Sequence, residues 1–244
     1  MVYQEFVPDL KLRPYIDAYW YLDGSKSESF VNLILPDGCI DIIYNLGEDS
    51  LTESGSVIFR NENVYLIGTM TRYKNSEVKP GTRLIGIRFK PGAFRCFYKF
   101  SSLHEITNTT IEFEKKRVPE ISLESKNVIN CLNRFFLDRL DTSKNGISLV
   151  IDLVRKYEGK ISVEALGRQS SMNLRLLERG FKTQMGISPK EFINFTRYQS
   201  ALKTIQNNSS ARSLLEIAFD HGYYDHAHLS NEIKKYTGRN PSDF

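Results

Sequence analysis

The chain has 244 residues, of which 41% are hydrophobic and 25% are charged, and its formal net charge is +4. These values are close to the globular average and exclude a disordered or fibrous chain. No stretch approaches the roughly 20 apolar residues that span a membrane, and the first residues lack the apolar core of a signal peptide. We therefore expect a soluble, cytoplasmic protein with no membrane partner.

Residues 1–145 show the pattern of short β-strands. Apolar runs separated by turn sequences recur at residues 30–35, 39–46, 56–60, 63–68 and 83–89. Strands at this spacing indicate a β-sandwich or β-barrel. We expect two helical interruptions: a brief helix running into a strand at residues 14–20, and a helix at residues 91–100 with proline near its first turn.

Residues 122–140 predict an amphipathic helix. Its apolar residues recur at spacings of three or four: Val128, Leu132, Phe135 or Phe136, and Leu140. This stripe either covers the β-rich half or pairs with a second copy of the chain. Monomer and homodimer therefore both remain open.

The polar segment 141–146 marks a domain boundary, which we place between residues 1–145 and 146–244. The charge changes at the same point, because residues 1–145 carry 19 basic and 19 acidic side chains whereas residues 146–244 carry 14 and 10. A basic segment beside a neutral one indicates a polyanionic partner for the basic segment alone.

Two stretches of the second part repeat each other, at residues 163–189 and 215–241. Each has the helix-turn-helix pattern: a small residue in the first helix, a turn residue suited to positive φ, and a second helix with apolar residues at i and i+4. These residues are Gly167, Ser171, Leu177 and Phe181 in the first copy, and Ala218, Gly222, Leu229 and Ile233 in the second. Because independent positions agree in register, the second part is predicted to be all-α with two such units.

Between the two copies, residues 188–208 predict one long helix. About 20 helical residues span about 30 Å, and successive major-groove faces on one side of a duplex lie about 34 Å apart. A rigid helix of this length can hold two DNA-reading helices one duplex turn apart within a single chain.

The candidate DNA-binding residues follow from the apolar positions. If those positions are buried, the opposite faces of the two second helices carry side chains that can contact bases or phosphates. They are Arg175, Glu178, Arg179 and Lys182 after the N-cap candidate Asn173, and His226, Ala227, Ser230 and Asn231 after the N-cap candidate Asp225. Gly180 lies inside the first of these helices, where glycine costs about 1 kcal/mol relative to alanine.

The second part resembles the DNA-binding module of AraC/XylS-type transcription regulators. The stretches that carry the resemblance are RLLERGFKTQMGISPKEF, RYQSAL and IAFDHGYYDHAHL. The first part, with LPDGCIDIIYN and GIRFKPGAF, is similar to a β-rich N-terminal domain found in one branch of these regulators. The resemblance implies an α+β chain in which a cupin-like sensing or dimerisation domain precedes the DNA-binding module.

No catalytic site, metal site or cofactor is expected. A Gly-rich phosphate loop and a GxSxG elbow are missing, and His226 and His228 diverge on a helix. Cys39, Cys96 and Cys131 lie far apart and are expected to be small buried residues. The candidates for an effector pocket are Trp20, Tyr44 and Arg88, because aromatic rings and one cation often orient a small ligand.

The sequence thus predicts a DNA-binding transcription regulator rather than an enzyme. Double-stranded DNA is the expected partner, with a small-molecule effector and RNA polymerase as further candidates. The rival hypothesis is a small-molecule-binding protein or enzyme whose helical region mediates assembly. The operator, the effector and the choice between activator and repressor stay open.

Overall fold

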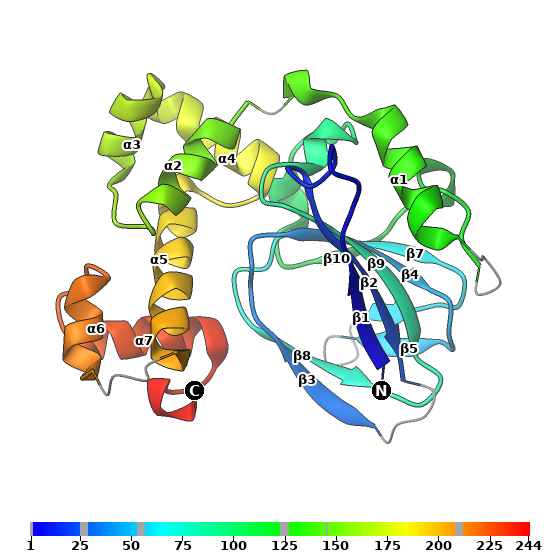
Figure 1. Ribbon diagram of the computed structural model, residues 1–244, viewed down its shortest axis with the longest axis horizontal. Coiled ribbons are helices and arrows are strands. Elements are labelled where there is room, and N and C mark those ends of the chain that lie inside the picture. The colour runs from blue at the N-terminus through cyan, green and yellow to red at the C-terminus, as the bar shows by residue number, and fades with distance from the viewer. Residues whose placement is uncertain (1, 25–28, 53–56, 123–126, 145, 208–211) are drawn as a thin grey trace.

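The computed structural model describes residues 2–24, 29–52, 57–122, 127–144, 146–207 and 212–244. A β-rich part comes first along the chain and a helical part follows, and the two pack side by side (Figure 1). Among these residues, no helix combines the length and the apolar character that crossing a bilayer requires.

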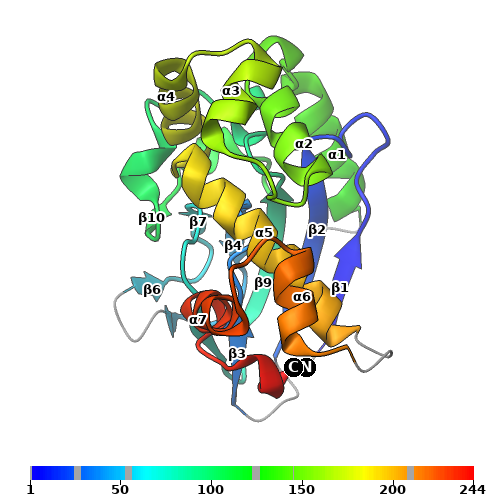
Figure 2. The same cartoon turned by 90° about the vertical axis from the view of Figure 1, so that its left-hand side faces the viewer.

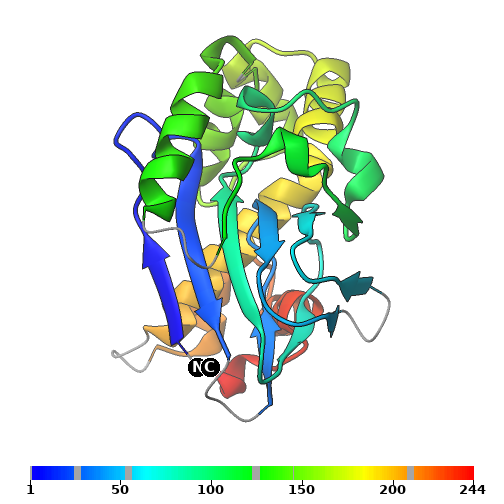
Figure 3. The same cartoon turned by 90° about the vertical axis from the view of Figure 1, so that its right-hand side faces the viewer.

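The β-rich part is built on a six-stranded antiparallel sheet. Its order is β1 (Val2–Phe6), β2 (Ile16–Asp23), β9 (Arg83–Phe89), β4 (Ile40–Asn45), β7 (Val64–Ile67) and β10 (Thr110–Glu112). Two further antiparallel pairs join β3 (Phe30–Ile34) to β8 (Lys74–Val78) and β5 (Ser50–Thr52) to β6 (Val57–Phe59). The sheet is open, so the sandwich expectation is confirmed and a closed barrel is not formed (Figure 3).

The two faces of this sheet bury different residues because side chains alternate along a strand. One face packs Ile42, Ile87 and Phe89 into the first hydrophobic core. Helix α1 (Val128–Arg139) covers that core with Leu132 and Phe136, which answers one of the two roles expected for residues 122–140. The opposite face forms a smaller hydrophobic cluster, which contains Trp20 and Leu22 of β2 and Val78 of β8.

The brief helix expected at the start of residues 14–20 is wrong, whereas the strand that it was expected to run into is confirmed as β2. The chain makes a turn in which Leu12 N donates to Asp9 O over 2.9 Å, and strand β2 then starts at Ile16. Strand β2 pairs with β1 on one side and with β9 on the other. Its β-branched and aromatic residues suit a strand, and pairing on both sides outweighs any local helical preference.

Other local expectations are corrected in part. The helix expected at residues 91–100 is reduced to the 3-10 helix η2 (Phe94–Cys96). The helix expected at residues 122–140 spans α1 alone, and residues 123–126 lie outside the described residues. Of the three cysteines, Cys96 is buried and Cys39 partly exposed, whereas Cys131 is exposed because it lies on the outer face of α1. Further 3-10 helices are η3 (Leu103–Ile106), η4 (Lys115–Arg117), η5 (Thr142–Lys144) and η6 (Pro241–Asp243).

The helical part has its own core. It contains α2 (Ser148–Lys156), α3 (Val163–Ser170), α4 (Leu174–Met185), α5 (Pro189–Gln206), α6 (Leu214–Asp220) and α7 (His226–Thr237). The buried residues of this core fall between Ile147 and Tyr236, and those of the first core between Leu12 and Phe136. Gly180 belongs to this packing, because a Cβ there would lie 2.9 Å from Ile147 Cγ2.

Candidate nucleic-acid interface

The first helix-turn-helix unit, α3 and α4, is set by caps and by one left-handed residue. Ser171, between the helices, has φ 56° and ψ 29°. The Asn173 side chain then accepts from Leu176 N over 2.9 Å and caps α4. A Cβ on Gly167 would lie 2.9 Å from Met172 O, so a small residue is needed where the turn passes over α3. Helix α4 ends at Gly186 with φ 83°.

The second unit, α6 and α7, repeats this construction. Gly222 takes the left-handed position with φ 72°. The Asp225 side chain accepts from His228 N over 2.7 Å and caps α7, and Gly238 ends the helix with φ 71°. Both predicted turns and both predicted N-caps are therefore present, and the caps fix where each second helix begins.

The apolar side chains of both units are fully buried, as predicted. Leu177, Phe181, Leu229 and Ile233 each have a relative exposure of 0%. Tyr198 of α5 stacks on Tyr236 of α7 with ring centroids 4.5 Å apart, and burial raises the pKa of both phenols. The long helix is thus joined to both units through one continuous core.

Helices α4 and α7, which we call the reading helices, stand near opposite ends of α5. Figures 1 and 2 show them running in the same general direction, with their C-terminal ends toward the β-rich part. The 18 residues of α5 extend over about 27 Å. This length is close to the repeat of the duplex, and the parallel arrangement lets both helices approach one side of it.

The predicted contact residues of the first reading helix are free to meet a partner. Arg175, Arg179 and Lys182 are exposed, and within the described part of the chain none of the three forms an ion pair. Glu178 is partly exposed. This surface therefore carries more positive than negative charge, which favours phosphate binding.

The second reading helix presents less charge. His226, Ala227 and Asn231 are exposed, whereas Ser230 is partly exposed and donates from Oγ to His226 O over 2.7 Å. Tyr224, which the sequence analysis missed, is 85% exposed just before the Asp225 cap. Its place between the turn glycine and the N-cap, two residues after Gly222, was the signal that could have found it, because residues there lie beside the start of the reading helix.

A polar network ties the second unit to α5. Arg197 of α5 lies 3.6 Å from Glu232 Oε2, and its guanidinium stacks over the Tyr223 ring at 4.6 Å. Tyr223 donates its hydroxyl to the same Glu232 oxygen over 2.9 Å. Nearby, Thr204 Oγ1 and His221 Nε2 are 2.9 Å apart, and burial lowers the pKa of His221. These contacts hold α7 and the α6 end against the long helix.

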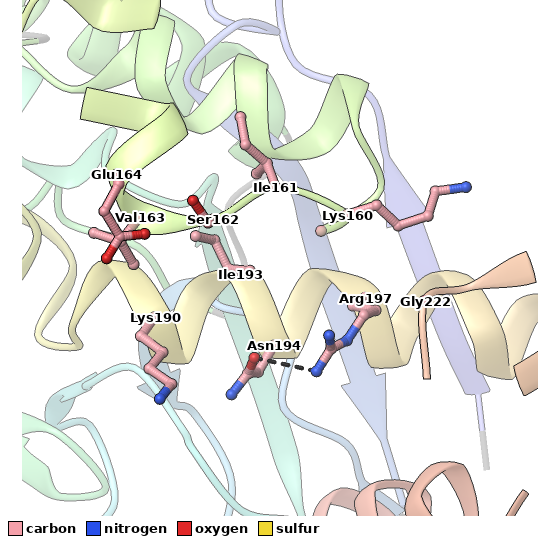
Figure 4. A pocket seen from close by; sticks show the side chains of 11 residues that line it. Lys160, Ile161, Ser162, Val163, Glu164, Lys190, Ile193, Asn194, Arg197 and Gly222 are labelled. Atoms are coloured by element: carbon pink, nitrogen blue, oxygen red, sulfur yellow. Dashed lines mark hydrogen bonds between the residues drawn. The ribbon is translucent and has the colours of Figure 1, made fainter. Parts of the chain in front are cut away.

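A hollow of about 530 Å³ lies between the two units along α5 (Figure 4). Lys190, Asn194 and Arg197 of α5 line one side, and the segment from Gly159 to Glu164 lines another. Arg197 donates to Asn194 Oδ1 over 3.3 Å, shown as a dashed line in Figure 4. The hollow separates the units and carries more basic than acidic side chains.

The three effector candidates do not line one pocket. Trp20 Nε1 donates to Asp41 Oδ1 over 2.9 Å, and Arg88 Nε lies 3.5 Å from the same oxygen. Burial raises the pKa of the Asp41 carboxyl to about 6. Tyr44 lies in the first core instead, where its hydroxyl donates to Pro119 O over 2.9 Å. Trp20 and Arg88 are therefore brought together, and Tyr44 is on the other face of the sheet.

Asp37 and Glu5 complete the surroundings of Arg88. Asp37 Oδ2 lies 3.6 Å from Arg88 Nε, and Glu5 Oε1 lies 3.7 Å from Arg88 Nη1. Asp37 also accepts from Cys39 N over 2.8 Å, a hydrogen bond typical of an aspartate in a turn. One guanidinium thus faces three carboxyl groups.

Together the helices form a double helix-turn-helix module. Residues 166–244 match a family model described as a helix-turn-helix domain, and residues 4–112 match one described as a domain of unknown function, DUF6597. The HTH-type transcriptional activator RhaS of Escherichia coli is 25% identical over 107 residues, which are 43% of this chain and 38% of RhaS. The chain therefore carries an AraC-type helix-turn-helix domain, and the resemblance to AraC/XylS-type regulators is confirmed.

Solved structures give weaker likenesses. ToxT of Vibrio cholerae is 11% identical with a TM-score of 0.48, over 100% of this chain and 97% of that chain. A probable AraC family transcriptional regulator of Rhodopseudomonas palustris is 20% identical with a TM-score of 0.34, over 39% of this chain and 93% of that one. The match to RhaS spans well under half of the length of that relative.

Proposed function

We propose that the chain is a sequence-specific DNA-binding transcription regulator. The observation that carries this proposal is the mounting of two helix-turn-helix units on one helix, with both reading helices running in the same direction. Each reading helix would enter one of two successive major-groove segments. The exposed cations of α4 would supply most of the attraction to phosphate, and α7 would contribute hydrogen-bonding contacts.

We assign base contacts to the predicted residues that project from the reading helices. Arg175 and Arg179 can grip guanine bidentately, and Asn231 favours adenine. Asn173 and Asp225 already serve as N-caps, so their main contribution is to orient the reading helices. Tyr224 is added as a phosphate or sugar contact, because an exposed tyrosine at this place has no packing role.

The β-rich domain, residues 1–145, would bias DNA binding through an effector, a partner such as RNA polymerase, or dimerisation. The Trp20–Asp41–Arg88 cluster is the place where we would look for an effector, since it combines an aromatic ring with charged groups. Together with Asp37 and Glu5, the cluster has three carboxyl groups around one guanidinium, so it suits a cationic or hydrogen-bond-donating molecule.

The test is in vitro selection of duplexes bound by the full chain, followed by binding measurements over a range of salt concentrations. The proposal expects one enriched site with two conserved segments about one duplex turn apart, and affinity that falls linearly on a logarithmic salt scale. The rival hypothesis, a small-molecule-binding protein or enzyme with a helical assembly region, expects no enrichment and no salt-dependent affinity for DNA.

A further inference from the structure

One loop of the β-rich domain touches the C-terminal ends of both reading helices. This loop, residues 68–73, connects β7 to β8. At its start, the buried Thr69 donates from Oγ1 to the carbonyl of Met185, the last residue of α4, over 2.5 Å. At its end, the Tyr73 ring lies against Gly238, the C-cap of α7, where a Cβ would be 2.5 Å from Tyr73 Cζ.

The loop is fastened within its own domain, mainly by Asn108. Asn108 Oδ1 accepts from Thr71 N over 2.7 Å, and Asn108 Nδ2 donates to Thr71 Oγ1 over 2.8 Å. The backbone N–H of Asn108 also donates to Thr69 O over 3.0 Å. Asn108 itself has φ 60°, a left-handed conformation that asparagine tolerates better than most residues. The loop is therefore a fixed part of the β-rich domain and not a free tether.

The end of α4 receives further hydrogen bonds from the same domain. Thr107 Oγ1 donates to Gly186 O over 2.8 Å, and His104 Nδ1 lies 2.8 Å from the same carbonyl, to which it can only donate. Ser102 Oγ donates to Lys182 O over 3.4 Å. The last carbonyls of a helix lack hydrogen-bond donors within the helix, and here the β-rich domain supplies donors to the end of α4. The C-terminal end of α4 is thus fixed to that domain.

The two domains together form a closed frame around the reading helices. Helix α5 joins the units through their shared core, and the loop at residues 68–73 joins their far ends through the β-rich domain. If α5 were the single connection, packing alone would resist rotation of one unit about the α5 axis relative to the other. Two connections at different points fix both the distance between the reading helices and their relative orientation. One base pair of added spacing moves a half-site by about 3.4 Å and turns it by about 35° about the duplex axis.

We propose that Thr69 and Tyr73 are positioning residues that set the half-site spacing the protein accepts. The inference rests on the proposed DNA-binding function and assigns its spacing selectivity to the β-rich domain. Loss of the loop contacts leaves each reading helix intact. Helix α4 keeps its hydrogen bonds from Ser102, His104 and Thr107, but α7 loses the Tyr73 contact at Gly238, so the two units can turn relative to each other. Tolerance of altered spacing is then the direct readout.

The first experiment measures the affinity of the full chain for its selected duplex and for duplexes with one base pair added or removed between the half-sites. The wild-type chain should lose about tenfold or more on either change, as when the base contacts of one reading helix are lost. Thr69→Val with Tyr73→Ala should reduce that penalty to about threefold or less by the same reasoning. Thr82→Val and Tyr3→Ala are matched controls in the β-rich domain and should keep the wild-type penalty, because neither residue touches a reading helix.

Thr69→Ser separates positioning from general damage. It keeps the hydroxyl that donates to Met185 and should keep the wild-type spacing penalty, whereas Thr69→Val alone should lower the penalty by less than the double variant does, because Ser102, His104 and Thr107 still hold α4. This pair also serves if the double variant does not fold. An unchanged penalty in Thr69→Val and in the double variant would overturn the inference while leaving the DNA-binding function in place.

The second experiment does not depend on DNA. Spin labels at Arg179→Cys and Asn231→Cys, in a chain with Cys39→Ser and Cys131→Ser, report the distance between the reading helices. The distribution should broaden when Thr69→Val and Tyr73→Ala are added and stay narrow with the matched controls. If no duplex is ever enriched, the proposed function fails and the label distances still decide whether the loop fixes the helices. A distribution equally narrow in all variants rejects the loop as a positioning element.

Discussion

Substitutions at the turn residues of the two helix-turn-helix units should change the stability of the chain in opposite directions. Ser171 and Gly222 hold equivalent left-handed positions, with φ of 56° and 72°. The left-handed conformation costs an L-residue about 1–2 kcal/mol, and glycine loses about 0.4–1 kcal/mol through the greater freedom of the unfolded chain. We therefore expect Ser171→Gly to raise the free energy of unfolding by about 0.5–1 kcal/mol, and Gly222→Ala to lower it by about 1 kcal/mol.

These stability changes can be estimated from the backbone alone because the side-chain contacts at both positions change little. A Cβ on Gly222 would lie 3.7 Å from Lys160 Cγ, an ordinary contact, so the cost there comes from the backbone. Ser171 is exposed at the end of α3, where its backbone N–H donates to Arg168 O. Glycine keeps that hydrogen bond.

Urea unfolding followed by far-ultraviolet circular dichroism measures both changes as shifts of the helical transition. Ser170→Gly is the matched control, one residue earlier and inside α3, where Ser170 Oγ donates to Leu166 O over 2.8 Å. It should be destabilised by about 0.5–1 kcal/mol, since glycine is a poor helix former. If Ser171→Gly lost stability as Ser170→Gly does, the left-handed strain assigned to the turn would not exist.

Three further predictions concern the interface, the core and pH. Arg179→Ala should lower the specific affinity for DNA by about 1–3 kcal/mol and relax base choice at one position, whereas Lys182→Ala should weaken binding to all duplexes and reduce the salt slope by about 1. In the same binding assays, the control Lys11→Ala in the β-rich domain should change neither the affinity nor the salt slope. Gly180→Ala should lower the urea midpoint despite better helix propensity, because its Cβ meets Ile147 Cγ2 at 2.9 Å, and a gain in stability would show that this contact yields freely. Because burial raises the pKa of Asp41 to about 6, the folded chain holds a proton that the unfolded chain releases near pH 4, so stability should fall as pH rises from about 4 to about 6. Asp41→Asn should flatten that change in urea melts at several pH values, and an unaltered pH profile would contradict it.

The helical module could be predicted from sequence in detail because its signals are local. Turn residues, caps and apolar spacing lie within a few residues of what they determine, as with Ser171 and Asn173. The cost assigned to Gly180 from helix propensity alone was incomplete, because Gly180 is also approached closely by Ile147, the N-cap residue of α2. That contact joins residues 33 positions apart in the printed sequence, and no local pattern reports it.

The β-rich domain was predicted less completely because strands depend on distant partners. Strand β8, Lys74–Val78, is mostly polar and forms through its pairing with β3. Strand β1 is exposed along its whole length and is held by β2. Both strands lack an apolar run, so the sequence pattern predicts neither of them.

The effector candidates show how much can be predicted from the alternation of side chains along a strand. Asp41 and Tyr44 are three residues apart on β4, so their side chains point to opposite faces, and this much follows once the strand is known. The meeting of Arg88 with Asp41 depends instead on the register of β4 against β9. The contacts of Thr69 and His104 with α4 are further still from any sequence signal, because they cross between domains.

Trp20 is the single tryptophan of the chain, and it lies over Gly86 with its indole nitrogen bonded to Asp41. Its fluorescence is therefore a built-in probe of the β-rich domain alone, free of any contribution from the helices that would grip DNA. Emission and circular dichroism recorded on one sample would tell whether the two halves melt together or in sequence. A ligand that binds beside the indole would also change the wavelength or intensity of the tryptophan emission, so its binding could be followed without any label.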